Sequence, residues 1–176
     1  MKTLYTMLTL LLVMSCSEEK KEMAMNMSDE AKMNQPKAVN LASMNNPILD
    51  NYFKIQEELV NDKIDNIMIN AQALKTAVEA AEFKNQEFML STVNDLLKAK
   101  TITDIRIAFK PLSDHMIAYA ESNPVSNDVY LMHCPMAFHN KGADWLQNSE
   151  TLYNPYYGSK MLTCGSTTKT IAKTEK

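Results

Sequence analysis

Glycine is missing from the first 141 residues of this chain, and that absence is the strongest constraint on its fold. The three glycines are Gly142, Gly158 and Gly165, in a sequence of 176 residues. Tight hairpin turns use glycine for their positive backbone angles, so a long region without it favours helices joined by short polar connections. A chain of this length with 45% hydrophobic residues can also build a packed core. We therefore expect helices first, and tight turns only near the C-terminus.

Apolar residues recur at helical spacing between Pro47 and Ser122. Asn46-Pro47 is a helix start, and Asn61-Asp62 ends or kinks the first helix. Pro111 should kink or split the last helix. The first three predicted helices cover residues 47–60, 64–83 and 86–98. The fourth is capped by Thr101 or Thr103 and runs to about Ser122. With connections this short, the pattern predicts a mainly α fold, an antiparallel bundle of about four helices.

A cap of loops and short strands is expected after Asn123-Pro124, which breaks the helical pattern. The segments with extended character are residues 129–132, 161–163 and 166–171. Trp145 should pack this cap against the bundle together with Tyr153, Tyr156 and Tyr157; a sugar-binding aromatic platform is the alternative. The domain is thus predicted to span residues 47–172, followed by a loose tail at 173–176.

The N-terminus predicts a lipoprotein signal peptide over residues 1–15. Lys2 precedes an apolar run that is too short to span a membrane, and Val13-Met14-Ser15-Cys16 resembles a lipobox. Cleavage would leave Cys16 as the lipidated residue, whereas a secretory peptide cut nearby would leave it an ordinary thiol. We expect an exported lipoprotein of a Gram-negative cell, anchored in lipid at the periplasmic face or the surface of the outer membrane.

Residues 16–46 are predicted to be a disordered, Met-rich tether. The charge cluster at 17–22 is followed by Met23, Met25 and Met27 among small and polar residues, with too little apolar content to fold alone. Three thioethers in five residues could serve as auxiliary ligands of a copper-collecting arm. Alternatively, these methionines have no function and reflect only the variable composition of a linker.

Two short sulfur-bearing arms in the cap suggest a metal site. The first is Cys134-Pro135-Met136, preceded by His133, and the second runs from Met161 to Cys164. Thiolate and thioether sulfur are soft donors that select Cu(I) over Mg²⁺, Ca²⁺ or Mn²⁺. We expect the two arms to fold back and share one pocket for Cu(I), with His133 as a further candidate ligand.

A disulfide is the main alternative for the same two cysteines. If Cys16 is lipidated, Cys134 and Cys164 remain as an even pair in an oxidising compartment. A bond closing a loop of about thirty residues would stabilise the fold by about 3–4 kcal/mol on the loop-entropy estimate. The protein would then be an interaction module. A methionine within three residues of each cysteine favours the metal site without deciding the matter.

Other candidate residues are weaker. His139 could add a ligand from a loop, and His115 or Met116 could reach the cap from the fourth helix. Met44, Met68 and Met89 are most simply core residues, a role that suits the flexible thioether.

The cap motifs resemble an uncharacterised bacterial domain family. The motifs are His133-Cys134-Pro135-Met136-Ala137, Lys141-Gly142-Ala143-Asp144-Trp145-Leu146, Asn154-Pro155-Tyr156-Tyr157-Gly158 and Lys160-Met161-Leu162-Thr163-Cys164-Gly165. The resemblance extends over roughly residues 47–171. Such domains occur in lipoproteins and fused to periplasmic adaptor subunits of heavy-metal (copper or silver) efflux systems. The resemblance implies a heavy-metal role, with an efflux adaptor as a partner.

Several function classes are disfavoured. The chain has no Gly-rich phosphate loop, no Cys-x-x-Cys pair and no His-Glu-x-x-His helix, so we expect no enzyme. The formal net charge is −3, and it becomes −4 once residues 1–15, with one lysine and no acidic residue, are removed. With no basic face, a nucleic-acid partner is not expected.

Overall fold

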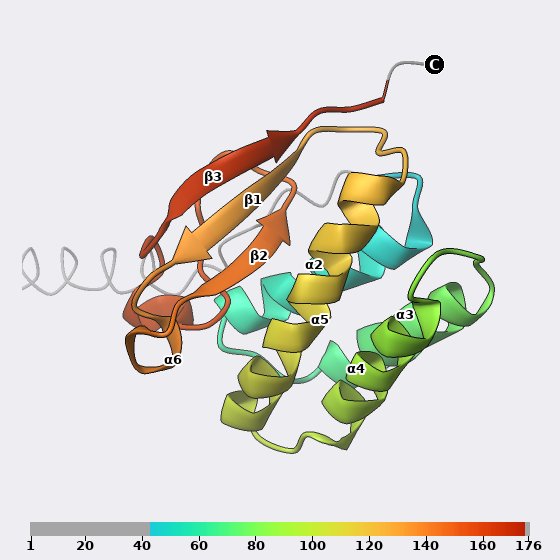
Figure 1. Ribbon diagram of the computed structural model, residues 1–176. Helices are drawn as coiled ribbons and strands as arrows, with labels where there is room; N and C mark the ends of the chain where they lie inside the picture. Colours follow the sequence, from blue (N-terminus) through green and yellow to red (C-terminus); the bar gives the residue numbers. More distant parts are fainter. Residues whose placement is uncertain (1–42, 175–176) are drawn as a thin grey trace, which may run out of the picture. The chain divides into compact units, whose positions relative to one another are not determined.

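The computed structural model describes residues 43–174, which form a bundle of four main helices followed by a three-stranded antiparallel sheet (Figure 1). The helices are α2 (Pro47–Val60), α3 (Ile67–Glu79), α4 (Gln86–Lys98) and α5 (Ile102–Ser122). Each helix packs against the next along the chain. The mainly α bundle with a C-terminal cap is therefore confirmed. Within the described residues, no helix combines the length and the apolar character needed to cross a membrane.

Several predictions concern residues outside this range. The signal peptide at 1–15, the lipidation site Cys16, and Met23, Met25 and Met27 of the tether lie outside the described residues. The last residues of the predicted tether, 43–46, lie within the described range and pack against the folded domain. Met44 is buried with 2% of its surface exposed, and its backbone N–H donates to Asp50 Oδ1 at 2.7 Å. The folded region therefore includes Ser43–Asn46, ahead of the predicted start at Pro47.

The start of α2 follows from its cap. Asn46 Oδ1 accepts hydrogen bonds from the N–H groups of Ile48 and Leu49, which have no partner within the helix. Pro47 occupies the first turn, where its missing N–H is not needed. The helix ends at Asn61-Asp62 as predicted, and Asp62 has a positive φ of 56°.

The second helix is shorter at both ends than the predicted span of 64–83. Residues 61–66 are used in turns that close α2, where the N–H of Lys63 donates to Glu58 O. At the other end, the side chain of Gln86 donates to Val78 O at 2.7 Å and satisfies a carbonyl that a longer helix would have used. The ends of α3 are thus set by residues outside the helix. The spacing of apolar residues within the helix does not indicate them.

The last helix, α5, is not split at Pro111. Proline removes one hydrogen bond to the carbonyl four residues earlier, here that of Ile107. Both Pro111 and Ile107 are exposed, so solvent can reach this part of the helix. The apolar face of α5, with Phe109, Leu112 and Met116, is fully buried and keeps the helix continuous through the proline.

The sheet has the strand order β2-β1-β3. β1 (Val129–Cys134) lies in the centre, β2 (Ala143–Gln147) packs against α5, and β3 (Ser166–Ile171) is the outer strand (Figure 1). β3 was predicted, whereas β2 was not. The predicted extended segment 161–163 is a turn. The last described residues are bonded, since Lys173 N donates to Asp128 Oδ1 and Thr174 N to Val125 O, both at 2.8 Å.

One side chain from the bundle and one from the cap complete the free edge of β2. The Tyr52 hydroxyl on α2 accepts from the N–H of Leu146 at 3.2 Å, and the Tyr156 hydroxyl donates to the carbonyl of Asp144 at 2.7 Å. An unpaired strand edge exposes polar backbone groups that otherwise need water or another strand. Trp145 lies beside this edge, fully buried, with its ring 5.8 Å from that of Tyr156 in an edge-to-face arrangement. The aromatic residues therefore join the cap to the bundle.

Arg106 on α5 ties three segments together. Its guanidinium donates to Leu59 O at the end of α2, to Asp62 Oδ1 at 2.7 Å and to Pro155 O in the cap. Asp62 also accepts from the N–H of Ser159 at 2.9 Å. Burial raises the pKa of Asp62, but the hydrogen bonds from Ser159 and Arg106 outweigh this effect and bring the pKa below its ordinary value of 3.8.

The lowered pKa of Asp62 predicts a specific acid sensitivity. A carboxyl group with a lower pKa in the folded state stabilises the fold above pH 4, and this contribution is lost as the pH falls through the folded-state value. Asp62→Asn should lower the free energy of unfolding by about 1 kcal/mol at pH 7 and flatten its decline below pH 4. Urea unfolding at several pH values between 7 and 3 measures both the loss of stability at pH 7 and its decline in acid. Asp95→Asn, which removes an exposed pair with Lys98, is the matched control. Equal pH slopes for the wild type and Asp62→Asn would contradict this account.

Candidate functional site

Two cysteine thiols meet at the edge of the cap. Cys134 is the last residue of β1, and Cys164 precedes β3 by two residues. Because β3 runs antiparallel to β1 with Ser166 opposite His133, the chain before β3 passes beside the end of β1. The two Sγ atoms lie 3.1 Å apart, and both cysteines are free. Cys134 is fully buried and Cys164 is half-buried, so the pair is accessible from one side.

Glycine at position 165 permits this close approach. A Cβ atom at Gly165 would lie 2.6 Å from the carbonyl oxygen of His133, closer than side-chain atoms can come to backbone. The φ angle of this glycine is +135°, which other residues rarely adopt. Gly165 therefore lets the second arm pass close beside the end of β1.

His133 lies on the other face of β1 from Cys134, because neighbouring side chains of a strand alternate. Cys134 shares its face with Met132 and pairs across the sheet with buried Ala143. The imidazole Nδ1 of His133 is 2.8 Å from Asp144 Oδ1 on β2, in a partly exposed pair. The structure therefore gives the imidazole a carboxylate partner and does not turn it towards the thiols. Asp144 was not among the predicted site residues, since its pairing depends on the strand register.

The two methionines of the arms differ in exposure. Met136 is 45% exposed, and Met161 is half-buried in the turn that leads to Cys164, whose N–H donates to Met161 O at 3.1 Å. Both belong to the backbone segments that carry the cysteines, and their side chains have three rotatable bonds each. The arms thus present two thiols held side by side, with one exposed and one half-buried thioether nearby in the sequence.

The surroundings of Cys164 favour its protonated state. The pKa of the Cys164 thiol is raised, first by its hydrogen bond with Cys134 and then by burial. A metal ion must therefore displace a proton, and binding should strengthen as the pH rises. Within residues 43–174, no group of three or more His, Cys, Asp and Glu side chains is arranged to hold a metal ion.

The loop after Cys134 has a strained backbone. Phe138, His139 and Asn140 have φ angles of 50°, 59° and 64°, three consecutive non-glycine residues in the left-handed region. A bulky residue such as Phe138 is unfavourable in this region by about 1–2 kcal/mol, whereas asparagine tolerates it. The ring of Phe138 packs edge-to-face on that of Tyr156, with centroids 5.3 Å apart, which helps to hold the turn. His139, a weaker candidate ligand, is exposed on this turn.

Neither candidate on α5 belongs to the cap site. Met116 is fully buried in the bundle, and His115 stacks on exposed Phe88 of α4 with centroids 6.2 Å apart. His115 also lines a cavity of about 150 Å³ beside Phe83, Met89 and Tyr119. Met44 and Met89 are core residues, and Met68 packs against the core, as expected.

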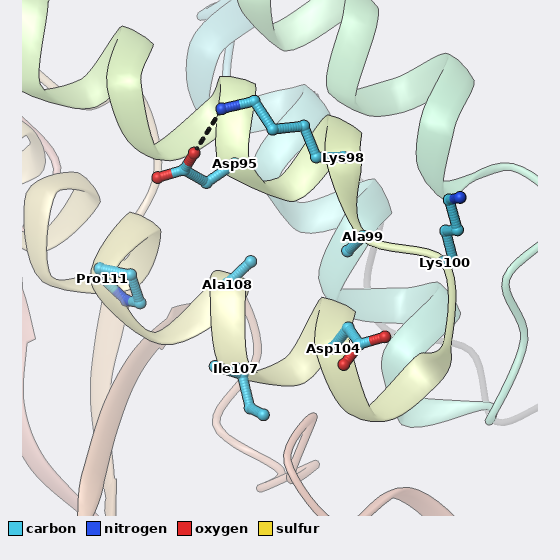
Figure 2. A pocket seen from close by; sticks show the side chains of 8 residues that line it. All are labelled: Asp95, Lys98, Ala99, Lys100, Asp104, Ile107, Ala108 and Pro111. Atoms are coloured by element: carbon cyan, nitrogen blue, oxygen red, sulfur yellow. Dashed lines mark hydrogen bonds and ion pairs between the residues drawn. The ribbon is translucent and has the colours of Figure 1, made fainter.

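A larger open groove, of about 500 Å³, lies between the end of α4 and the first half of α5 (Figure 2). Its floor is small and apolar, with Ala99 and Ala108, and the Asp95–Lys98 ion pair lies on its α4 side. None of its lining residues belongs to the cap, so this groove is separate from the thiol pair.

The comparisons with known proteins match the helical part of the chain. Residues 48–128 match the family described as "Protein of unknown function (DUF3347)". The matched region covers α2–α5 and ends before β1, so it contains neither Cys134 nor Cys164 and is narrower than the resemblance drawn from the motifs. No curated protein and no solved structure matches the chain. The chain thus carries a DUF3347 domain of unknown function over residues 48–128.

Proposed function

We propose that this protein binds one Cu(I) ion through the thiolates of Cys134 and Cys164. The observation that carries the proposal is the 3.1 Å separation of their Sγ atoms, with Cys164 half-buried beside buried Cys134. Two adjacent thiols with methionines on the same arms are the donor set that soft monovalent copper prefers. Met161 and Met136 are the additional thioether candidates, and His133 is the more remote one because its Nδ1 already faces Asp144.

The two thiols need to move only slightly apart to hold a metal ion between them. Two sulfurs on one metal ion with bonds of about 2.3 Å lie about 3.8 Å apart in tetrahedral geometry and about 4.6 Å apart in linear geometry. The pair must therefore open by about 0.7–1.5 Å to hold an ion. Rotation of the half-buried Cys164 side chain supplies such a change without movement of the sheet.

The donor set disfavours zinc. Structural zinc sites use four nitrogen, sulfur or oxygen ligands. The described residues supply two thiolates, and no third charged or imidazole ligand stands with them. A soft ion that accepts thioethers needs fewer charged ligands, which supports Cu(I).

The cellular role rests on the N-terminal sequence. With Cys16 lipidated, the copper site would be held at the membrane on the periplasmic face or the surface of the outer membrane. There the protein would buffer Cu(I) or deliver it to the adaptor of an efflux system, without enzymatic turnover. The Met-rich segment with Met23, Met25 and Met27 would collect copper for the cap.

A structural disulfide is the second candidate, and the same distance supports it. The Sγ atoms need to approach by about 1 Å to reach the bonded distance of about 2.05 Å. In that case the Cys134–Cys164 bond would join the ends of β1 and β3, and the protein would act as an interaction module through its surface.

Competition against a chromophoric Cu(I) chelator tests the proposal. The fully reduced protein is expected to withdraw one Cu(I) per chain, and protein alkylated at its thiols is expected to withdraw none. Intact-mass measurement of anaerobically isolated protein, alkylated without reductant, reports whether Cys134 and Cys164 are free. No copper uptake by the reduced protein, together with thiols that resist alkylation until a reductant is added, would instead establish the disulfide.

A further inference from the structure

The segment Asn154–Gly158 lies between the two sulfur-bearing arms and is bonded to both. Asn154 is fully buried, although it is polar. Its Nδ2 donates to the carbonyl of Cys164 at 2.7 Å, and its backbone N–H donates to the carbonyl of Leu162 at 2.7 Å. One buried residue therefore holds the second arm at two points, one of them on Cys164 itself.

Tyr157 connects the same segment to the first arm. Its hydroxyl donates to the carbonyl of Met136 at 2.6 Å, two residues beyond Cys134. Its backbone N–H donates to Asn154 Oδ1 at 3.2 Å, and that oxygen also accepts from the N–H of Tyr156 at 2.8 Å. A chain of hydrogen bonds thus runs from the backbone of Cys164 through Asn154 and Tyr157 to the backbone of Met136.

The bundle fixes this segment in place. Pro155 O accepts from Arg106 Nε of α5 at 2.8 Å, and the ring of Tyr156 lies 6.0 Å from that of Phe109 on the same helix. The N–H of Gly158 closes the turn on the carbonyl of Asn154 at 3.0 Å. The segment is therefore a rigid support, anchored on α5.

We infer that Asn154 and Tyr157 are positioning residues that set the distance between the Cys134 and Cys164 thiols. The side-chain hydrogen bonds of both residues go to backbone carbonyls rather than to sulfur, so each holds the backbone of one arm. Hydrogen bonds of this kind around metal ligands change metal affinity by about 10–100-fold when they are removed. The inference assigns a role in copper binding only if the proposed function holds, but thiol positioning itself can be measured without copper.

The test compares Asn154→Ala and Tyr157→Phe with the wild type in two measurements. The first is Cu(I) affinity by chelator competition. The second is the equilibrium constant for closing the Cys134–Cys164 disulfide with oxidised glutathione, in which two protein thiols become one disulfide and one glutathione disulfide becomes two glutathione thiols. Both variants are expected to lower each quantity about tenfold or more, because separated arms bring the sulfurs together less often.

Tyr119→Phe is the matched control. It removes one tyrosine hydroxyl that accepts from Asn46 Nδ2 at 2.9 Å, at the start of α2, and should leave both quantities within about twofold of the wild type. Tyr157→Phe deletes a single oxygen from a half-buried ring, so it keeps the test decisive even if Asn154→Ala does not fold.

The two measurements distinguish a failure of the positioning inference from a failure of the proposed copper binding. Unchanged disulfide equilibria in both variants would overturn the inference, whatever copper does. A lowered equilibrium constant in a protein that does not bind Cu(I) would support the positioning role and refute the proposed function. Lowered values in both measurements would support both.

Discussion

Replacing both Cys134 and Cys164 with serine is expected to weaken Cu(I) binding by at least about a thousandfold, equivalent to about 4 kcal/mol. Serine is nearly the same size, but its oxygen is a hard and neutral donor that a soft ion does not select. Because the size hardly changes, the substitution should alter the chemistry of the site more than its packing, although a serine hydroxyl at fully buried Cys134 also costs some stability. Chelator competition with the reduced wild type and the double variant measures the effect.

Two controls locate the binding site. A variant lacking residues 17–42 removes Met23, Met25 and Met27 but leaves the packed residues from Ser43 onward, and its affinity should stay within a few-fold of the wild type. Met136→Leu and Met161→Leu test the thioethers separately, and Met161→Leu should have the larger effect because Met136 is 45% exposed. Unchanged affinity in the double cysteine variant would exclude the cap as the copper site. Loss of binding on deletion of residues 17–42 alone would move the site to the Met-rich segment.

Trp145→Ala is expected to lower the free energy of unfolding by about 3–5 kcal/mol. Trp145 on β2 has no exposed surface, and its ring packs on that of Tyr156, which also contacts Phe109 of α5. Its Nε1 also donates to Gln147 Oε1 at 3.2 Å, so the variant leaves a cavity and removes a buried hydrogen bond. Urea unfolding followed by far-ultraviolet circular dichroism gives the value, because this signal does not depend on the single tryptophan.

Ile69→Ala is the matched control for this prediction. Ile69 is 68% exposed on α3, so its truncation should change stability by no more than about 0.5 kcal/mol. Because Trp145 joins the cap to the bundle, Trp145→Ala should also expose both cysteines to alkylation more rapidly. A loss of less than about 1 kcal/mol would show that the cap does not depend on this contact.

The helices could be predicted because their causes are local. The Asn46-Pro47 start and the apolar spacing of α2 and α5 act within one or two turns, and the structure has the corresponding cap and buried faces. The ends of α3 could not be predicted, because Gln86 and the turn after Asp62 set them from outside the helix.

β2 was missed for a related reason. Ala143, Trp145, Leu146 and Gln147 are all buried, so the strand lacks the alternation of apolar and polar residues that marks a half-exposed strand. Its free edge is completed by Tyr52, which lies more than ninety positions earlier. No local pattern contains that contact.

The cap site was partly accessible from the sequence. The spacing of sulfur residues suggested that Cys134 and Cys164 meet, and the structure places their Sγ atoms 3.1 Å apart. The pairing of His133 with Asp144 depends on strand register, and the left-handed turn at 138–140 begins with Phe138, a bulky residue that seldom adopts it. The hydrogen bonds of Asn154 and Tyr157 follow from tertiary structure alone.

X-ray absorption at the copper edge of the Cu(I)-loaded, reduced protein tests the central claim most directly. We predict a first shell made of sulfur, containing the two thiolates of Cys134 and Cys164, which disappears in the double serine variant. A first shell dominated by nitrogen or oxygen, or a sulfur shell that survives in the double variant, would contradict it.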